Sequence, residues 1–202
     1  MQLPHLRSVL SMPFSKQEVK QSPDRVVMEM LGEDQINLRR NEGVVAMARG
    51  VAMSIPKNTG NLLILAAHYH NIGMSKFLSG EINFAPLRGA MWTQDMGLPS
   101  SVTRAIFEQS GSRLLSKLCP GAAECYLANP EKPSSLSMYL SYCDLRISSA
   151  GEIVSMPVRF QEMMGKHEAG SAHCKVMEAL WNYFESVVEA VEHRLPSEIR
   201  AF

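Results

Sequence analysis

The chain has 202 residues, 46% hydrophobic and 20% charged, which is enough for one sizeable domain with a hydrophobic core. Its twenty basic and twenty acidic residues cancel to a formal net charge of zero, which argues against nucleic-acid binding. The longest apolar stretches, 44–48 and 62–67, are far shorter than the roughly 20 residues of a membrane-spanning helix. Residues 1–14 lack the features of a secretion signal. We therefore expect a cytoplasmic protein that binds neither nucleic acid nor membrane.

Helical periodicity dominates the N-terminal half of the chain. A first helix is expected to run from Pro23, with Ser22 as its cap, to about Gly32. A second helix is expected over 36–54, and the proline, asparagine and glycine within 56–60 are expected to end it.

The next predicted helix, over 61–71, is apolar nearly all round until its histidines. This pattern indicates a buried, central helix. An irregular segment is expected over 74–83. Helices over 86–96 and 99–107 follow, separated by Gly97.

The C-terminal half begins with a loop, expected over 119–135 because it is rich in proline and glycine. A helix over 136–146, capped by one of the two preceding serines, and a short helix over 158–164 follow. The last long helix, 172–193, carries an apolar stripe that is expected to face the core. With no alternating strands, repeat or linker in the pattern, we predict one all-α domain over 1–202, a helical bundle of eight or nine helices.

The four cysteines form no Cys-x-x-Cys pair, and no nearby histidine completes a zinc site. The expected state is a reduced thiol at each position, and a disulfide or metal role is the less favoured alternative. The positions are Cys119, Cys125, Cys143 and Cys174.

The segment 66–73, Ala-Ala-His-Tyr-His-Asn-Ile-Gly, joins a predicted buried helix to a histidine–asparagine pair. His70 could serve as a ligand or as a hydrogen-bonded core histidine. Asn71 before Ile-Gly could equally mark a helix end, where asparagine and glycine tolerate left-handed geometry. His68 lies two residues before His70, so the two side chains point to different helix faces and cannot chelate together.

Two segments far apart in the chain carry a family resemblance. The first is LLILAAHYHNIGMSKF, residues 62–77, and the second is LSMYLSYCDLRISSAGEIVSMPVRF, residues 136–160. Together they resemble the HD-domain superfamily of all-α, metal-dependent phosphohydrolases. Members of that family show an apolar helix that ends in His-Asp-Ile-Gly and a later helix whose aspartate precedes a basic residue. Asp144, followed by Leu145-Arg146, matches that later aspartate.

The region between these segments fits the same family. Residues 40–52, RNEGVVAMARGVA, correspond to the opening motif, and residues 86–110 resemble the helix–Gly-Leu-Pro–helix unit that connects the motifs. The resemblance thus covers about 36–164 and implies an HD-domain-like fold, on which the helix over 172–193 is expected to pack.

The resemblance implies a metal-binding set of four residues: a histidine on the first helix, the His-Asp pair and the late aspartate. These positions are held here by Asn41, His70, Asn71 and Asp144. Carboxylates and imidazoles hold a divalent cation and lower the pKa of its bound water. Asn41 and Asn71 supply neither charge nor imidazole. We therefore expect no cofactor and assign no catalytic residue. The four residues are predicted to bind a ligand, with a divalent metal on His70 and Asp144 as the alternative.

Three functions remain open at this point. The favoured one is a degenerate HD-domain protein without metal-dependent hydrolysis, which binds a small-molecule phosphate ligand or a protein partner. The second is an active phosphohydrolase on nucleotides or other phosphate esters, with Glu81 or Glu108 as replacement ligands. Auxiliary ligands of the family would fall near residues 85 and 108–110. The third is a structural interaction module, consistent with fourteen methionines that can pack adaptable surfaces.

Two smaller alternatives concern the surface. Ser75-Lys76 and Ser79-Gly80 could hold a phosphate with hydroxyl and ammonium groups, or could form a solvated loop. The stripe over 181–191 could pack a homodimer as well as the core.

Overall fold

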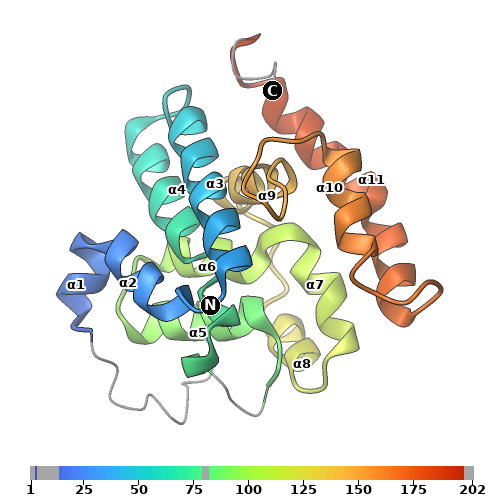
Figure 1. Cartoon of the computed structure of the whole chain (residues 1–202), viewed down its shortest axis with the longest axis horizontal. Helices are drawn as coiled ribbons and strands as arrows, with labels where there is room; N and C mark the ends of the chain where they lie inside the picture. Colours follow the sequence, from blue (N-terminus) through green and yellow to red (C-terminus); the bar gives the residue numbers. More distant parts are fainter. Residues whose placement is uncertain (1–2, 4–13, 79–81, 198–202) are drawn as a thin grey trace.

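Helices make up 71% of the structure, a computed structural model that describes residues 3, 14–78 and 82–197. The described residues contain no strand, only an isolated bridge between Ile147 and Ile153. The predicted all-α bundle is therefore confirmed (Figure 1). The α-helices are α1 (Lys16–Gln21), α2 (Pro23–Leu31), α3 (Gln35–Ala52), α4 (Lys57–Tyr69), α5 (Ala85–Asp95), α6 (Ser100–Glu108), α7 (Ser112–Leu115), α8 (Ala122–Leu127), α9 (Ser135–Leu145), α10 (Met156–Met164) and α11 (Ala172–Glu192).

Short helices account for the difference from the eight or nine expected. α1 and α7 were not predicted, and α8 lies within the segment 119–135 that was predicted to be a loop. Four short 3-10 helices join the longer elements: η1 (Ile72–Met74), η2 (Lys76–Leu78), η3 (Gln109–Gly111) and η4 (Ser116–Leu118). α8 begins after Gly121, whose positive φ of 79° suits glycine and turns the chain into the helix.

The first residues and N-terminal caps of the helices agree with the prediction at some positions and differ at others. Of the two serines predicted as alternative caps of α9, Ser134 is the cap, because its Oγ accepts a hydrogen bond of 3.1 Å from the Ser137 amide. Ser22 precedes α2, but its side chain makes no capping hydrogen bond. α4 begins four residues earlier than predicted, directly after Pro56, and Gly60 lies inside it. A Cβ at Gly60 would lie 3.0 Å from the Ala52 side chain, so glycine lets α4 pack closely on α3.

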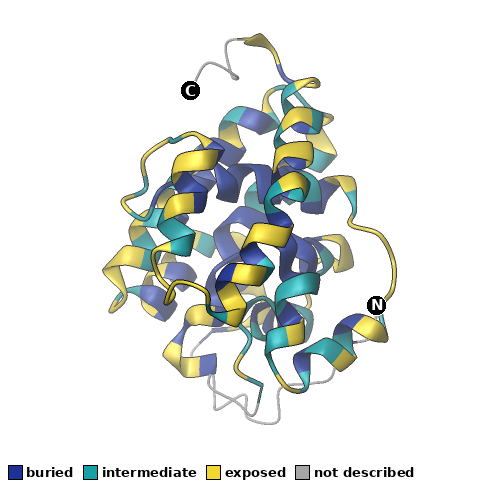
Figure 2. Cartoon of the chain, turned by 90° about the vertical axis from the view of Figure 1, so that its right-hand side faces the viewer, coloured by how far each residue is buried: buried dark blue, intermediate teal, exposed yellow. Residues whose placement is uncertain are grey.

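The core lies around α9. This helix contacts α3, α4, α6 and α11, and nine of its eleven residues are buried. Figure 2 shows the buried residues gathered at the centre of the bundle, with exposed residues on the outward turns of the surrounding helices. α4 and α9 pack against each other, and their C-terminal ends lie close together, since His70, directly after α4, lies 3.5 Å from Asp144 in the last turn of α9.

α11 packs on the rest of the bundle through α9, α10 and α7. Its buried residues follow the helical period: Cys174, Met177, Leu180, Phe184, Val187 and Val191. The predicted stripe is confirmed at Leu180, Phe184, Val187 and Val191, whereas the other predicted members, Val176, Tyr183 and Val188, are half-buried. Trp181, at the edge of this stripe, packs edge-on against Phe160 with ring centroids 4.8 Å apart. A homodimer through this helix stays a prediction.

The link between α4 and α5 depends on close backbone approach. A Cβ at Gly73 would lie 1.9 Å from the Ala85 carbonyl oxygen and 2.8 Å from the Gly89 nitrogen. Asn71 has φ of −100°, so the left-handed helix end considered from the sequence is not formed there. Gly73 is needed because no side chain fits between η1 and α5.

The four cysteines are all free thiols. Burial raises the pKa of Cys143 and of Cys125, which disfavours their reactive thiolate forms. Within the part of the chain that the structure describes, no helix is both long and apolar enough to cross a membrane.

Candidate functional site

Three of the four predicted site residues come together where α3, α4 and α9 meet. The His70 Nε2 atom lies 3.5 Å from Asp144 Oδ1, and both side chains are buried. Asn41, from α3, places its Nδ2 atom 3.4 Å from His70 Nδ1. Asn71 follows His70 in the chain and is buried as well, with its Nδ2 atom lacking a hydrogen-bond partner among the described residues.

The ring of His70 has the orientation that metal-binding histidines use. Its Nδ1 atom lies 2.7 Å from the Ala67 carbonyl oxygen, which can only accept, so Nδ1 carries the proton and donates. Metal-binding histidines generally donate one ring nitrogen in this way and present the other to the metal. The Nε2 atom of His70 is buried without a hydrogen bond and faces Asp144. His70 is thus oriented like a ligand.

Asn41 serves the backbone instead of a ligand. Its amide nitrogen donates to the His68 carbonyl oxygen at 2.9 Å and lies 3.4 Å from that of Ala67. These carbonyls belong to the last turn of α4, which lacks helical donors. The Asn41 amide therefore joins α3 to α4. Its NH2 group, which has only hydrogens to offer, lies beside His70, whereas a metal ligand at this position would need a lone pair.

Arg40, which was not among the predicted site residues, forms an ion pair with the carboxylate of Asp144. Its guanidinium Nη2 donates to Asp144 Oδ1, and Ser110 Oγ donates to Oδ2 at 2.8 Å. The Arg40 side chain is 12% exposed and that of Asp144 is 6% exposed, so this is a largely buried ion pair. A permanent internal cation thus lies on the one charged ligand of the predicted set. The only sequence signal for it was its position directly before Asn41.

The charges around Asp144 explain how a buried carboxylate stays ionised. Burial by itself would raise the pKa of Asp144. The charge of the Arg40 guanidinium, then the nearby His70 ring and the charge of Arg159, outweigh that effect and hold the pKa of Asp144 well below its usual range. Asp144 is therefore an anion whose charge is compensated within the protein.

Ser110 has unusual backbone geometry at this site. Its φ of 46° and ψ of 44° are left-handed values that residues with a side chain rarely adopt. The Ser141 hydroxyl oxygen accepts a hydrogen bond of 2.8 Å from the Ser110 amide, and the Ser110 hydroxyl reaches Asp144. Strained backbone of this kind is concentrated at functional sites. Ser110 lies in the segment 108–110, where auxiliary ligands were expected.

The carboxylates considered as replacement ligands do not contribute to this site. Glu108 is buried, and its carboxylate accepts hydrogen bonds from Arg104 at 3.2 Å and from Ser137 at 3.0 Å. Glu81 lies outside the described residues. Among the residues that the structure describes, no group of three or more histidine, cysteine, aspartate or glutamate side chains could hold a metal ion.

A second layer of charge surrounds the Arg40–Asp144 pair. Arg159, 2% exposed, donates from Nη1 to Glu162 Oε2 at 2.9 Å, while its Nε atom has no hydrogen-bond partner in the described structure. Lys166 makes no ion pair with a described residue. Burial, and then the charges of Arg159 and Arg40, lower its pKa. Arg40 pairs with Asp144 and Arg159 with Glu162, and Lys166 feels the charges of all four groups. The cluster formed by Arg40, Asp144, Arg159, Glu162 and Lys166 therefore carries a formal excess of one positive charge.

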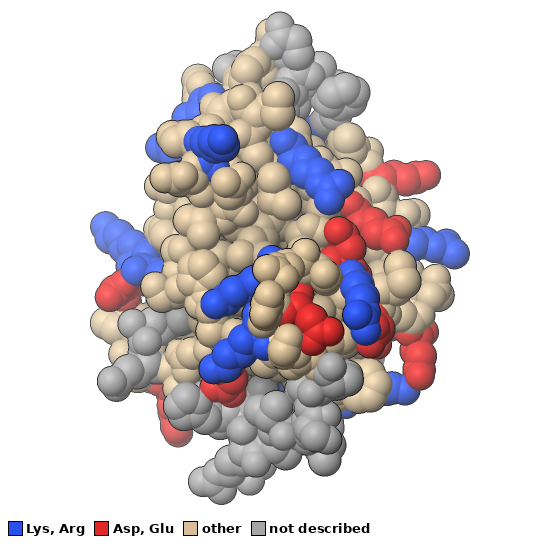
Figure 3. Space-filling model, turned by 90° about the vertical axis from the view of Figure 1, so that its left-hand side faces the viewer, with Lys and Arg blue, Asp and Glu red and all other residues tan. Residues whose placement is uncertain are grey.

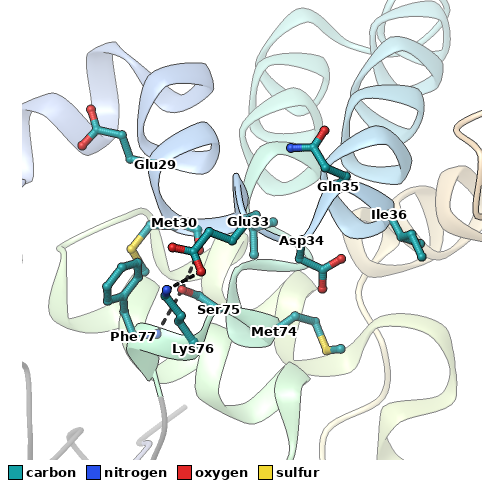
Figure 4. A pocket seen from close by; sticks show the side chains of 11 residues that line it. Glu29, Met30, Glu33, Asp34, Gln35, Ile36, Met74, Ser75, Lys76 and Phe77 are labelled. Atoms are coloured by element: carbon teal, nitrogen blue, oxygen red, sulfur yellow. Dashed lines mark hydrogen bonds and ion pairs between the residues drawn. The ribbon is translucent and has the colours of Figure 1, made fainter.

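The Ser75-Lys76 loop, where a phosphate was considered, uses its polar groups within the protein. Figure 4 shows Lys76 reaching toward Glu33 across a pocket of about 500 Å³ between α2, α3 and the loop, and the two side chains form an ion pair. Ser75 Oγ donates to the Met30 carbonyl oxygen at 2.8 Å. Ser79-Gly80 lies outside the described residues. On the face shown in Figure 3, basic and acidic side chains lie next to one another without separating into large patches of one sign.

Comparisons of the chain with models of known families, with curated proteins and with solved structures give no match.

Proposed function

We propose that this chain is a degenerate HD-domain protein that binds a small anionic ligand of the phosphate class without metal-dependent hydrolysis. The observation that carries the proposal is the guanidinium of Arg40 on the carboxylate of Asp144. The ligand-like orientation of His70 and its proximity to Asp144 support descent from a metal-binding cleft.

The side chains present do not fit a divalent metal. A metal would need the oxygens of Asp144, but Arg40 and Ser110 already bind both of them. Its double positive charge would also lie against the Arg40 guanidinium, which does not lose its proton in proteins. Asn41 directs amide hydrogens to backbone carbonyls and offers no lone pair in that direction. Arg40 therefore supplies the positive charge that a metal would supply in an intact member of the family.

The excess positive charge favours an anion. Asp144 is compensated by Arg40, and Glu162 accepts from Arg159 at 2.9 Å, so the ammonium of Lys166 is the cation left without a described partner. Lys166 is exposed, so its ammonium is accessible to an anion from solvent. A phosphate monoester offers the multiple acceptor oxygens that guanidinium and ammonium groups bind well.

Metal analysis separates this proposal from an active phosphohydrolase. Untagged protein, titrated with Mn²⁺ by calorimetry and analysed by elemental mass spectrometry, is expected to hold no stoichiometric metal. A triple variant, Arg40→Ala with Asn41→His and Asn71→Asp, is expected to gain Mn²⁺ binding. The double variant Asn41→His with Asn71→Asp, which keeps Arg40, should gain much less Mn²⁺ affinity. Stoichiometric metal on the unchanged protein, or equal gain in both variants, would contradict the role given to Arg40.

Anion binding is tested separately with phenyl phosphate, followed by calorimetry at neutral pH and low salt. Lys166→Glu should weaken binding at least about fivefold, because it reverses the accessible charge of the cluster. Lys175→Glu, a charge reversal at another exposed lysine, on α11, is the matched control. The anion proposal fails if phenyl phosphate does not bind, or if both variants weaken it equally.

A further inference from the structure

A large apolar pocket lies apart from the Asp144 cluster, between α7, α8 and α11. Its volume is about 530 Å³, within the roughly 300–1,000 Å³ typical of sites for small organic ligands. Its apolar and aromatic lining comes mainly from Leu114, Ala123, Tyr126, Leu127, Leu180 and Tyr183. Leu127 is 78% exposed at its edge. A surface of this kind gains free energy when an apolar group covers it.

The charged groups of the pocket favour an anion. Arg113 and Lys117 contribute two positive charges to its wall, and Glu108 contributes one negative charge. The Glu108 carboxylate is already bound by Arg104, which does not line the pocket, and by Ser137. Arg113 donates to neutral backbone carbonyls and lies 4.0 Å from Glu108. Lys117 is exposed and makes no ion pair or hydrogen bond with a described residue, so its charge is available.

Tyr183 adds a polar group to the apolar wall. Its ring is half-buried, and its hydroxyl makes no hydrogen bond with a described residue. Burial, and then the charge of Glu108, raise the pKa of Tyr183, which keeps the phenol protonated and able to donate.

We propose that this pocket is a second ligand site, specific for a small amphipathic monocarboxylate, such as a medium-chain fatty acid. The apolar body packs against Leu114, Ala123 and Leu180, and the carboxylate pairs with the ammonium of Lys117 at the mouth. The Tyr183 hydroxyl is the donor available inside the pocket. A cationic amphiphile of the same length is disfavoured by Arg113 and Lys117, and a neutral one lacks the ion pair.

Calorimetry on the full chain at neutral pH tests the site with hexanoate, octanoate, 1-octanol and octylammonium. Each buried CH₂ group strengthens apolar binding about fourfold, so octanoate should bind about 15-fold more tightly than hexanoate. Octanoate should bind more tightly than octanol, and octylammonium most weakly. Equal affinity for the three eight-carbon probes, or no saturable octanoate binding, would overturn the proposal.

Variants assign the binding to this pocket. Lys117→Glu should weaken octanoate at least about fivefold and change octanol less than about twofold, because it alters the charge alone. Ala123→Trp should abolish the binding of both octanoate and octanol, because the indole ring would fill the pocket. Leu127→Glu should weaken octanoate binding, and the variant is expected to fold because Leu127 is 78% exposed. Lys175→Glu is again the matched control. Unchanged octanoate affinity in both Lys117→Glu and Leu127→Glu would place the binding elsewhere. Because Arg40 and Lys166 do not line this pocket, the result is independent of the phenyl phosphate experiment.

Discussion

Replacing Arg40 by methionine leaves the buried carboxylate of Asp144 without its cation. The Arg40 side chain is 12% exposed and that of Asp144 is 6% exposed, so solvent screens the pair weakly. Breaking a buried ion pair by removing one partner typically costs about 3–5 kcal/mol. At about 2–4 °C per kcal/mol for a chain of this size, Arg40→Met should lower the melting temperature by about 6–20 °C.

A double-mutant cycle isolates the pair. Urea unfolding at pH 7 is measured for Arg40→Met, Asp144→Asn and the double variant. The double variant should recover most of the loss, because both charges are then absent.

The loss of stability in Arg40→Met should also depend on pH. In the unchanged protein the pKa of Asp144 is lowered, so its contribution to stability is present above about pH 4 and is lost as the pH falls. In Arg40→Met the largest cause that lowers this pKa is gone, so the pKa of Asp144 rises and the loss should shrink as the pH falls through the raised pKa.

Arg39→Met is the matched control, since Arg39 is the exposed neighbour of Arg40 on the same helix. It should change stability by less than about 0.5 kcal/mol. Exposed ion pairs contribute less than about 1 kcal/mol to the free energy of unfolding. A loss that small for Arg40→Met, or no coupling between Arg40 and Asp144 in the cycle, would refute the role of a buried ion pair.

Three further predictions use other features of the structure. Ser110→Ala should destabilise by about 1.5–3 kcal/mol by losing the hydrogen bond to a charged group, and Ser110→Gly by about 1 kcal/mol less, because glycine relieves the left-handed strain. Equal melting temperatures of Ser110→Ala and Ser110→Gly would contradict the strain at this position. Gly73→Ala should destabilise by more than about 2 kcal/mol because its Cβ meets a backbone carbonyl, whereas Gly50→Ala, with open space around it, should stabilise by about 0.5–1 kcal/mol in chemical denaturation. Burial lowers the pKa of His68, so its contribution to stability is full above about pH 6.5 and declines below it. His68→Gln should flatten the loss of stability between pH 6.5 and 5, and an unchanged slope would exclude His68 as its source.

Sequence periodicity and local capping were enough to predict the all-α fold and most of the long helices. α9 was predicted within one residue at each end, and its cap was narrowed to Ser134 or Ser135, because apolar spacing and a serine cap are local signals. Short helices such as α8 were missed because a few turns held by tertiary contacts carry little periodicity. Gly60 was taken as a breaker, although its role is close packing between α3 and α4.

The family resemblance of the sequence grouped Asn41, His70, Asn71 and Asp144, and the structure places Asn41, His70 and Asp144 close together. Only the tertiary structure showed that Arg40 binds Asp144 and that Ser110 completes its hydrogen bonds. The physical reason is that a long, flexible arginine on α3 and a strained serine after α6 reach α9 through packing between helices distant in the chain. Such contacts leave no spacing in the sequence, and they decide whether Asp144 is available to a metal.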